Sequence, residues 1–165
     1  MKFRKADEKD AKAVCEIYKC AKLLLKNSNI PQWQGNDPGP ATFAEDVKAG
    51  SCYVLEENGI VLATVQIIPN EPYYQTLSGG KFEDDNAVVA HRFAVSDKIL
   101  RHGVGSELIS QCCKTAVSFG KTSIRLDTHK LNFRMRNLLT KNGFRQVGNV
   151  ILPTGEERIV FEKIL

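Results

Sequence analysis

The stretch that most constrains the fold is residues 88–118, where a β-branched strand (88–95) runs through a glycine turn into a helix (103–118). Gly103 and Gly105 shape this turn. Backbone N–H groups without an intrahelical partner converge at the start of a helix, and the helix dipole adds a partial positive charge. A Cβ at either glycine would hold an anion away from that backbone. The turn therefore predicts a phosphate-bearing ligand.

The spacing of the two glycines narrows the class of phosphate site. Gly105 is followed by Ser106-Glu107-Leu108, so the chain has neither the dinucleotide pattern Gly-x-Gly-x-x-Gly nor a triphosphate loop ending in Gly-Lys-Ser/Thr. These two common phosphate sites are disfavoured. A glycine turn that only starts a helix is the competing interpretation.

Length and composition indicate a soluble globular protein. A chain of 165 residues suits one domain, residues 1–165, with a core of its own. The 42% hydrophobic and 25% charged content is ordinary for such proteins. No apolar run approaches the roughly 18 residues of a membrane helix, and the first residues lack the apolar region of a secretory signal. We expect a cytoplasmic protein without a membrane partner.

Charged residues are unevenly distributed along the chain. The net charge is +4, yet residues 98–145 contain ten Lys or Arg and two acids, whereas the rest has 13 basic and 17 acidic residues. This bias favours a polyanionic small ligand near the glycine turn. Interleaved exposed aromatics and nucleic-acid modules are missing, so we expect no nucleic-acid partner. The five cysteines form no Cys-x-x-Cys pair, which argues against a disulfide framework or a metal site and favours reduced core residues.

The remaining pattern alternates helices and strands. A strand at 2–5 leads to the N-cap residue Asp7 and a helix to about residue 26, and a loop at 27–40 precedes a second helix at 42–49. Asn58-Gly59 predicts a hairpin, because this dipeptide suits a tight turn between strands. The other expected segments are the hairpin strands 51–56 and 60–68, a long polar loop 69–86, a strand at 123–127, a helix from 132 to 141, and final strands at 144–150 and 158–165. Only the unit through residues 88–127 demands a parallel strand pair.

This order and two motifs resemble the GNAT superfamily of acyl-CoA-dependent N-acetyltransferases. The family's loop Arg/Gln-x-x-Gly-x-Gly/Ala is matched by Gly103 and Gly105, and its Asn followed eleven residues later by Gly-Phe is matched by Asn132 and Gly143-Phe144. The resemblance implies an α/β fold with a single mixed, largely antiparallel sheet of six to seven strands, helices on both faces and splayed central parallel strands. It also implies acetyl-CoA as the acyl donor.

By this resemblance, three segments would bind the donor. Main-chain N–H groups of the glycine turn would hold the pyrophosphate, strand backbone would pair with the pantetheine arm, and a later helix would line its far side. The residues of the glycine turn are Arg101, His102, Gly103, Val104, Gly105 and Ser106. Those of the strand are Phe93, Ala94 and Val95, and those of the helix are Asn132 and Met135. The chain departs from the family at Leu100, which fills the Arg/Gln position, and at Leu139, where a tyrosine commonly acts as the general acid.

The chemistry of the reaction points to a base rather than an acid. The thiolate of CoA resembles that of cysteine, whose pKa is about 8.5, whereas a lysine-like amine has a pKa of about 10.4 and must lose a proton before it attacks. His91 lies two residues before Phe93 on the same strand and is the candidate base. A packed, hydrogen-bonded histidine is the alternative, and His129, the acidic run 83–85 and a water-mediated base compete with it.

The acceptor is not encoded in a recognisable motif. Trp33 lies in the loop after the first helix, where it would either contact the acceptor or cover the core, and Tyr73 and Tyr74 carry the same ambiguity. We expect a monomeric or homodimeric N-acetyltransferase that transfers acetyl from acetyl-CoA directly to the primary amine of a small molecule or protein, without metal. A noncatalytic acyl-CoA-binding or regulatory module is the alternative.

Overall fold

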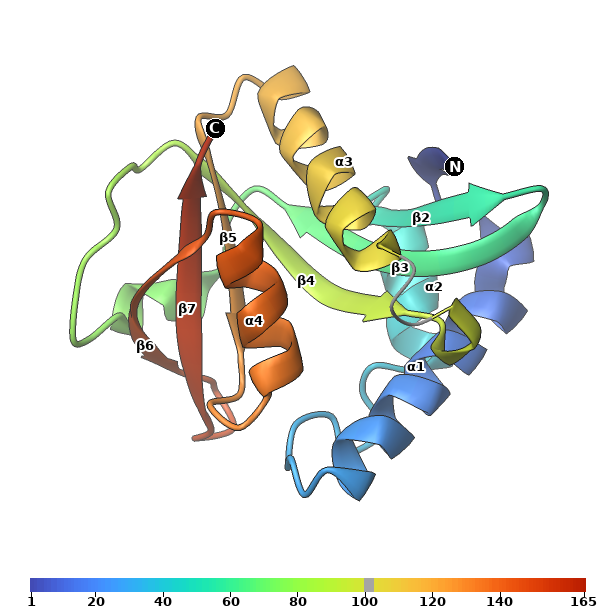
Figure 1. Cartoon of the computed structure of the whole chain (residues 1–165), viewed down its shortest axis with the longest axis horizontal. Helices are drawn as coiled ribbons and strands as arrows, with labels where there is room; N and C mark the ends of the chain where they lie inside the picture. Colours follow the sequence, from blue (N-terminus) through green and yellow to red (C-terminus); the bar gives the residue numbers. More distant parts are fainter. Residues whose placement is uncertain (100–102) are drawn as a thin grey trace. The chain divides into compact units, whose positions relative to one another are not determined.

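The computed structural model describes residues 1–99 and 103–165 and has, within these ranges, seven strands and four α-helices (Figure 1). The predicted order of elements is confirmed, with boundaries shifted by up to three residues. In chain order the elements are β1 (Lys2–Lys5), α1 (Ala11–Asn27), α2 (Pro40–Lys48), β2 (Cys52–Glu57), β3 (Ile60–Ile68), β4 (Ala87–Val95), α3 (Val104–Ser118), β5 (Ser123–Thr128), α4 (Phe133–Lys141), β6 (Arg145–Ile151) and β7 (Glu157–Ile164).

The strands form one mixed sheet in the order β1-β2-β3-β4-β5-β7-β6. β1 and β3 pair antiparallel with β2, and β5 and β6 pair antiparallel with β7. β4 and β5 are parallel, as the sequence predicts for the strand-helix-strand unit. Their register runs from Ala87 opposite Ser123 to Val89 opposite Arg125, although both strands continue further. The later half of β4 therefore lies beyond this register.

The chain divides into two compact units. Unit 1 comprises residues 1–67 and 92–111, and unit 2 comprises residues 68–91 and 112–165. β4 and α3 each pass from one unit into the other. The single-domain organisation expected from the length stays a prediction.

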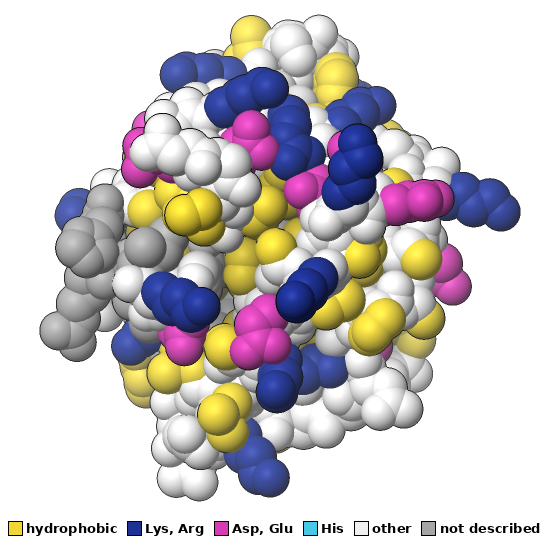
Figure 2. Space-filling view, turned by 90° about the vertical axis from the view of Figure 1, so that its right-hand side faces the viewer, with side chains coloured by type: hydrophobic (Ala, Val, Ile, Leu, Met, Phe, Trp, Pro, Cys, Tyr) yellow, Lys and Arg dark blue, Asp and Glu magenta, His cyan; other side chains and the backbone are white. Residues whose placement is uncertain are grey.

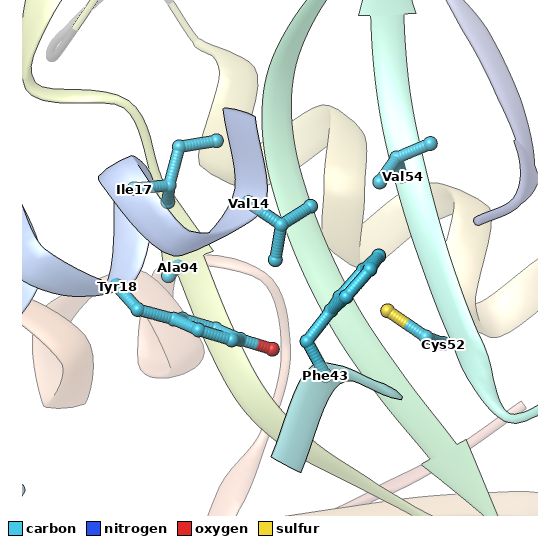
Figure 3. Close-up of a cluster of buried hydrophobic side chains, with 7 residues drawn as sticks. All are labelled: Val14, Ile17, Tyr18, Phe43, Cys52, Val54 and Ala94. Carbon is cyan, nitrogen blue, oxygen red and sulfur yellow. The ribbon is translucent and has the colours of Figure 1, made fainter. Parts of the chain in front are cut away.

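The core of unit 1 joins α1 and α2 to the sheet. Val14, Ile17 and Tyr18 of α1 recur at helical spacing and turn toward Phe43 of α2 and Val54 of β2 (Figure 3). All five are at most 5% exposed. Asp7 caps the 3-10 helix η1 (Glu8–Asp10) that precedes α1, because its side chain accepts a hydrogen bond from the Lys9 N–H at 2.8 Å. The N-cap of α1 itself is Asp10, three residues later than the sequence predicts.

The predicted hairpin is also confirmed in unit 1. Asn58 and Gly59 have φ values of 51° and 78°, which suit a two-residue turn between antiparallel strands. On β2, Val54 and its neighbour Leu55 are both fully buried although they point to opposite faces. The sheet is therefore covered on both faces here.

The segment 69–86 in unit 2, expected to be a long polar loop, contains more structure than the sequence predicts. It contains the 3-10 helix η2 (Pro72–Thr76), and Tyr74 of this helix packs with Val89, Val150 and Val160 in the core of the unit. Further along, Ser78 makes a bridge to Asn149 of β6. The sequence does not predict these contacts, because a single buried tyrosine in a polar segment produces no periodic hydrophobic pattern.

A buried ion pair anchors the later part of this loop. The Arg125 Nε of β5 donates to Glu162 Oε1 of β7 at 2.9 Å, and Glu162 Oε2 accepts from the Glu83 N–H at 2.7 Å. Arg125 also donates to the Asp84 carbonyl and lies over the Phe82 ring, 3.4 Å from its centroid. The loop is thus attached near both of its ends.

None of the helices among the described residues has the length and apolar character that a membrane-spanning helix needs.

Candidate active site

The glycine turn has the geometry that the sequence predicts. Gly103 has a φ of 78°, and a Cβ built there would meet no atom within 4 Å. α3 begins at the next residue, and the Glu107 N–H donates to the Gly103 carbonyl at 3.0 Å. The N–H groups of Val104 and Gly105 therefore belong to the first helical turn, where helix geometry provides no intrahelical acceptor. Leu100, Arg101 and His102 lie outside the described residues, and phosphate binding at this turn stays a prediction.

The strand before the turn contains a left-handed residue. Arg92 has a φ of 52°, which is unusual for a residue with a Cβ. Phe93, Ala94 and Val95 follow it, with Ala94 buried and the other two half-buried. The regular alternation of side chains along a strand does not hold across such a residue. The contact of these three residues with the pantetheine arm stays a prediction.

His91 lies in a cluster of acidic and phenolic side chains within unit 2. Its Nε2 is 3.0 Å from Glu71 Oε2, and its Nδ1 is 3.6 Å from Asp127 Oδ2. The Tyr73 and Tyr74 hydroxyls both donate to Asp127 Oδ2 at 3.0 Å, and the Tyr73 hydroxyl is 3.5 Å from His91 Nε2. The side chains of His91 and Asp127 are 15% and 7% exposed. The cluster is therefore largely sheltered from solvent.

The electrostatics of the cluster keep both tyrosines protonated. Burial, followed by the charge of Asp127, raises the pKa of Tyr73 above its ordinary value, and the same causes raise the pKa of Tyr74. Both hydroxyls consequently remain donors to Asp127 at neutral pH. The Asp127 carboxylate, held by both hydroxyls, lies beside Nδ1 of His91.

The sequence reasoning found His91 but not its partners. Register explains why: Val89 lies opposite Arg125, and His91 and Asp127 each stand two residues further along their parallel strands. Side chains two residues apart share a face of a strand, so the two meet. The parallel pair was predictable, whereas its register was not. Glu71 lies at the start of the long loop, and nothing in the sequence around it indicates a contact with His91.

The competing bases have other partners. Burial lowers the pKa of His129, and its Nδ1 accepts from the Leu131 N–H at 3.2 Å. In the acidic run, Glu83 faces Arg145 at 3.5 Å, and the Asp84 carboxylate accepts from Thr122 and from the Asn86 N–H. The contacts of these groups lie outside the His91 cluster.

Three other predicted site residues have structural partners in the described chain. Asn132 caps α4, because its Oδ1 accepts from the Met135 N–H at 3.2 Å, and its Nδ2 donates to Thr128 at 3.1 Å. Trp33 packs against the core of unit 1, with its ring 6.3 Å from that of Tyr18 in an edge-to-face arrangement. Met135 is half-buried. The contacts of Asn132 and Met135 with the donor, and of Trp33 with the acceptor, stay predictions.

Cys52 and Cys112 are buried core residues as predicted, whereas Cys15, Cys20 and Cys113 are only half-buried. All five thiols are free, and burial raises the pKa of Cys52 to about 11 and that of Cys112 still higher. Such thiols are poor nucleophiles at neutral pH. Among residues 1–99 and 103–165, no group of three or more His, Cys, Asp or Glu side chains is arranged to hold a metal ion.

The fold and the turn together define the class of the protein. A mixed seven-stranded sheet with four helices among the described residues, and a helix starting at a glycine turn after β4, is the fold of acyl-CoA N-acyltransferases. The family model described as the acetyltransferase (GNAT) family matches residues 12–144. The chain therefore belongs to the GNAT acetyltransferase family.

Solved structures agree with this assignment. A GNAT-family acetyltransferase from Streptococcus agalactiae is 25% identical, with a TM-score of 0.85 over 99% of this chain and 95% of that one. A GNAT-family acetyltransferase from Listeria monocytogenes is 21% identical, with a TM-score of 0.75 over 99% and 94% of the two chains. A ribosomal-protein-alanine N-acetyltransferase from Brucella melitensis is 17% identical, with a TM-score of 0.74 over the whole of both. A search of curated proteins finds no match.

Proposed function

We propose that this protein is an N-acetyltransferase that transfers an acetyl group from acetyl-CoA directly to a primary amine. One observation carries the proposal: His91 lies between the carboxylates of Glu71 and Asp127, two residues before the backbone that the family resemblance assigns to the pantetheine arm. A histidine in this setting can take up the proton that an attacking amine must lose.

The cluster suits an amine that arrives as an ammonium ion. Glu71 is 19% exposed, so its carboxylate can meet a cation from solvent and hold it beside His91. Proton transfer to His91 then leaves the neutral amine ready to attack the thioester carbonyl, and Asp127 stabilises the positive ring. The thiolate that departs resembles a cysteine thiolate, with a pKa of about 8.5, so its release does not require a strong acid.

The general acid of the family has no counterpart at its usual position. Leu139 is fully buried on α4, where it serves as a core residue of unit 2. This observation favours the second candidate, a noncatalytic acyl-CoA-binding module that retains the fold. Both candidates would bind acetyl-CoA, but only the acetyltransferase would transfer its acetyl group and release CoA.

Thermal melting and thiol release test the proposal together. Acetyl-CoA at millimolar concentration is expected to raise the Tm, because a ligand that binds only the folded state stabilises it. Incubation with a panel of small amines and peptides is expected to release free CoA thiol. A Tm rise without thiol release from any amine would favour the binding module, and no Tm rise would contradict both candidates.

Gly103→Ala is expected to weaken CoA binding about tenfold, because a left-handed residue with a Cβ costs roughly 1–2 kcal/mol and the turn must shift to relieve it. Titration calorimetry with CoA measures the effect. Gly59→Ala is the matched control, since Gly59 has the same φ of 78° and equally open surroundings in the β2–β3 hairpin. Equal CoA affinity in the two variants would argue against phosphate binding at the turn.

Leu139→Tyr is expected to destabilise the protein by about 1–3 kcal/mol without raising the rate of acetyl transfer, because a larger ring overpacks a filled core. Urea denaturation and thiol release measure the two quantities. The exposed neighbour Thr140→Tyr should change stability little. A faster and equally stable Leu139→Tyr variant would mean that the position accepts a catalytic tyrosine.

A further inference from the structure

The left-handed residue of β4 is held by a polar clamp within unit 1. Arg92 Nη1 contacts Asp46 of α2, at 3.3 Å from Oδ1 and 3.2 Å from Oδ2, and donates to the side-chain carbonyl of Gln66 of β3. Gln66 Nε2 in turn donates to Asp46 Oδ1 at 2.7 Å. The three side chains thus contact one another in a closed ring, and we call this ring the Asp46–Gln66–Arg92 clamp.

Two of the three side chains of the clamp are buried, and the Arg92 side chain is 25% exposed. Asp46 and Gln66 are 5% and 9% exposed, and Gln66 also reaches Ser51 Oγ at 3.4 Å. A charge pair shielded from water is screened little and holds its partners in a defined geometry. On the face shown in Figure 2, basic and acidic side chains are interspersed among hydrophobic ones.

A left-handed residue with a Cβ persists only where its surroundings enforce it. Here the enforcement comes from two elements outside β4, because Asp46 and Gln66 fix the end of the Arg92 side chain. The φ of 52° at Arg92 sets the direction in which the N–H and C=O groups of Phe93, Ala94 and Val95 point. Without the clamp, the strand could relax toward regular extended geometry.

We propose that Asp46 and Gln66 are positioning residues for donor binding: they hold Arg92 left-handed and thereby aim the β4 backbone at the pantetheine arm. Neither residue touches the donor in this scheme. The inference rests on the proposed function, because it concerns the backbone to which that function assigns the donor. It assigns a role to two residues that no motif of the sequence singles out.

Asp46→Asn tests the inference against Asp10→Asn as matched control. Asp10 is also buried in unit 1, 6% exposed, and also binds an arginine, since Arg4 donates to its two oxygens at 2.7 and 2.9 Å, but this pair joins β1 to the turn before α1. Both variants should lower the Tm. Only Asp46→Asn is expected to weaken CoA binding, about tenfold by calorimetry, and to raise the KM for acetyl-CoA with kcat nearly unchanged.

The free protein gives an independent readout of the clamp. Asp46→Asn and Gln66→Leu are expected to shift the amide NMR signals of residues 93–95 and speed their hydrogen exchange, whereas Asp10→Asn should leave them in place. Arg92→Gly removes the guanidinium, so adding Asp46→Asn to it should weaken CoA binding no further. Additive effects of these two substitutions, or wild-type CoA affinity in Asp46→Asn, would overturn the inference. Wild-type protein that fails to bind CoA would instead overturn the proposed function and the inference with it.

Discussion

Replacing His91 with alanine is expected to lower kcat for acetyl transfer by about 10²- to 10⁴-fold, the usual contribution of a general base. CoA affinity should stay near that of the wild type, because the imidazole contacts Glu71 and the Asp127 cluster and is not part of the phosphate turn. Thiol release under saturating acetyl-CoA and amine measures kcat, and calorimetry measures the CoA Kd.

A histidine elsewhere in unit 2 supplies the control for this experiment. His129→Ala should retain kcat within a few-fold, because its Nδ1 serves a local backbone contact with Leu131. The two outcomes separate catalysis from stability, since both variants lose one partly buried imidazole. If His91→Ala kept the wild-type kcat, Glu71 or a water bound to it would have to supply the base.

Replacing Glu162 with leucine is expected to destabilise the protein by about 3–5 kcal/mol, because Arg125 would remain buried without its charge partner. The Glu83 N–H would lose its acceptor as well. Urea denaturation measures the loss. The double variant Arg125→Met with Glu162→Leu should recover part of it, since apolar side chains of similar volume can replace a buried ion pair.

An exposed ion pair of the same unit gives the matched control. Arg145→Ala removes the partner of Glu83, where the two side chains are 79% and 50% exposed, and pairs of this kind contribute about 0–1 kcal/mol. A Glu162→Leu variant no less stable than Arg145→Ala would show that the Arg125 pair does not anchor the loop.

Local chemistry in the sequence predicted much of the fold. Asp7 as a cap, Asn58-Gly59 as a hairpin turn and Gly103 as the start of α3 each act through neighbouring residues, so the pattern alone identifies them. The parallel pairing of β4 and β5 was also predictable, because two strands joined by a crossover helix in one sheet usually run parallel.

The partners of the site residues could not be predicted in the same way. The register of β4 on β5 and the path of one loop bring Glu71, His91 and Asp127 together. Neither can be inferred from a short stretch of sequence. The left-handed conformation of Arg92 depends on Asp46 and Gln66, which lie 46 and 26 residues away in sequence. Contacts of this range are set by tertiary packing and override local preference.

The loop of residues 69–86 bears on which acceptors can enter. Tyr74 secures its first part in the core of unit 2, and the Arg125–Glu162 pair secures its last part, so Glu71 stands on a tethered segment and not on a swinging lid. In the proposed function, a cationic acceptor therefore meets the Glu71 carboxylate at a fixed position, without a loop closing over it.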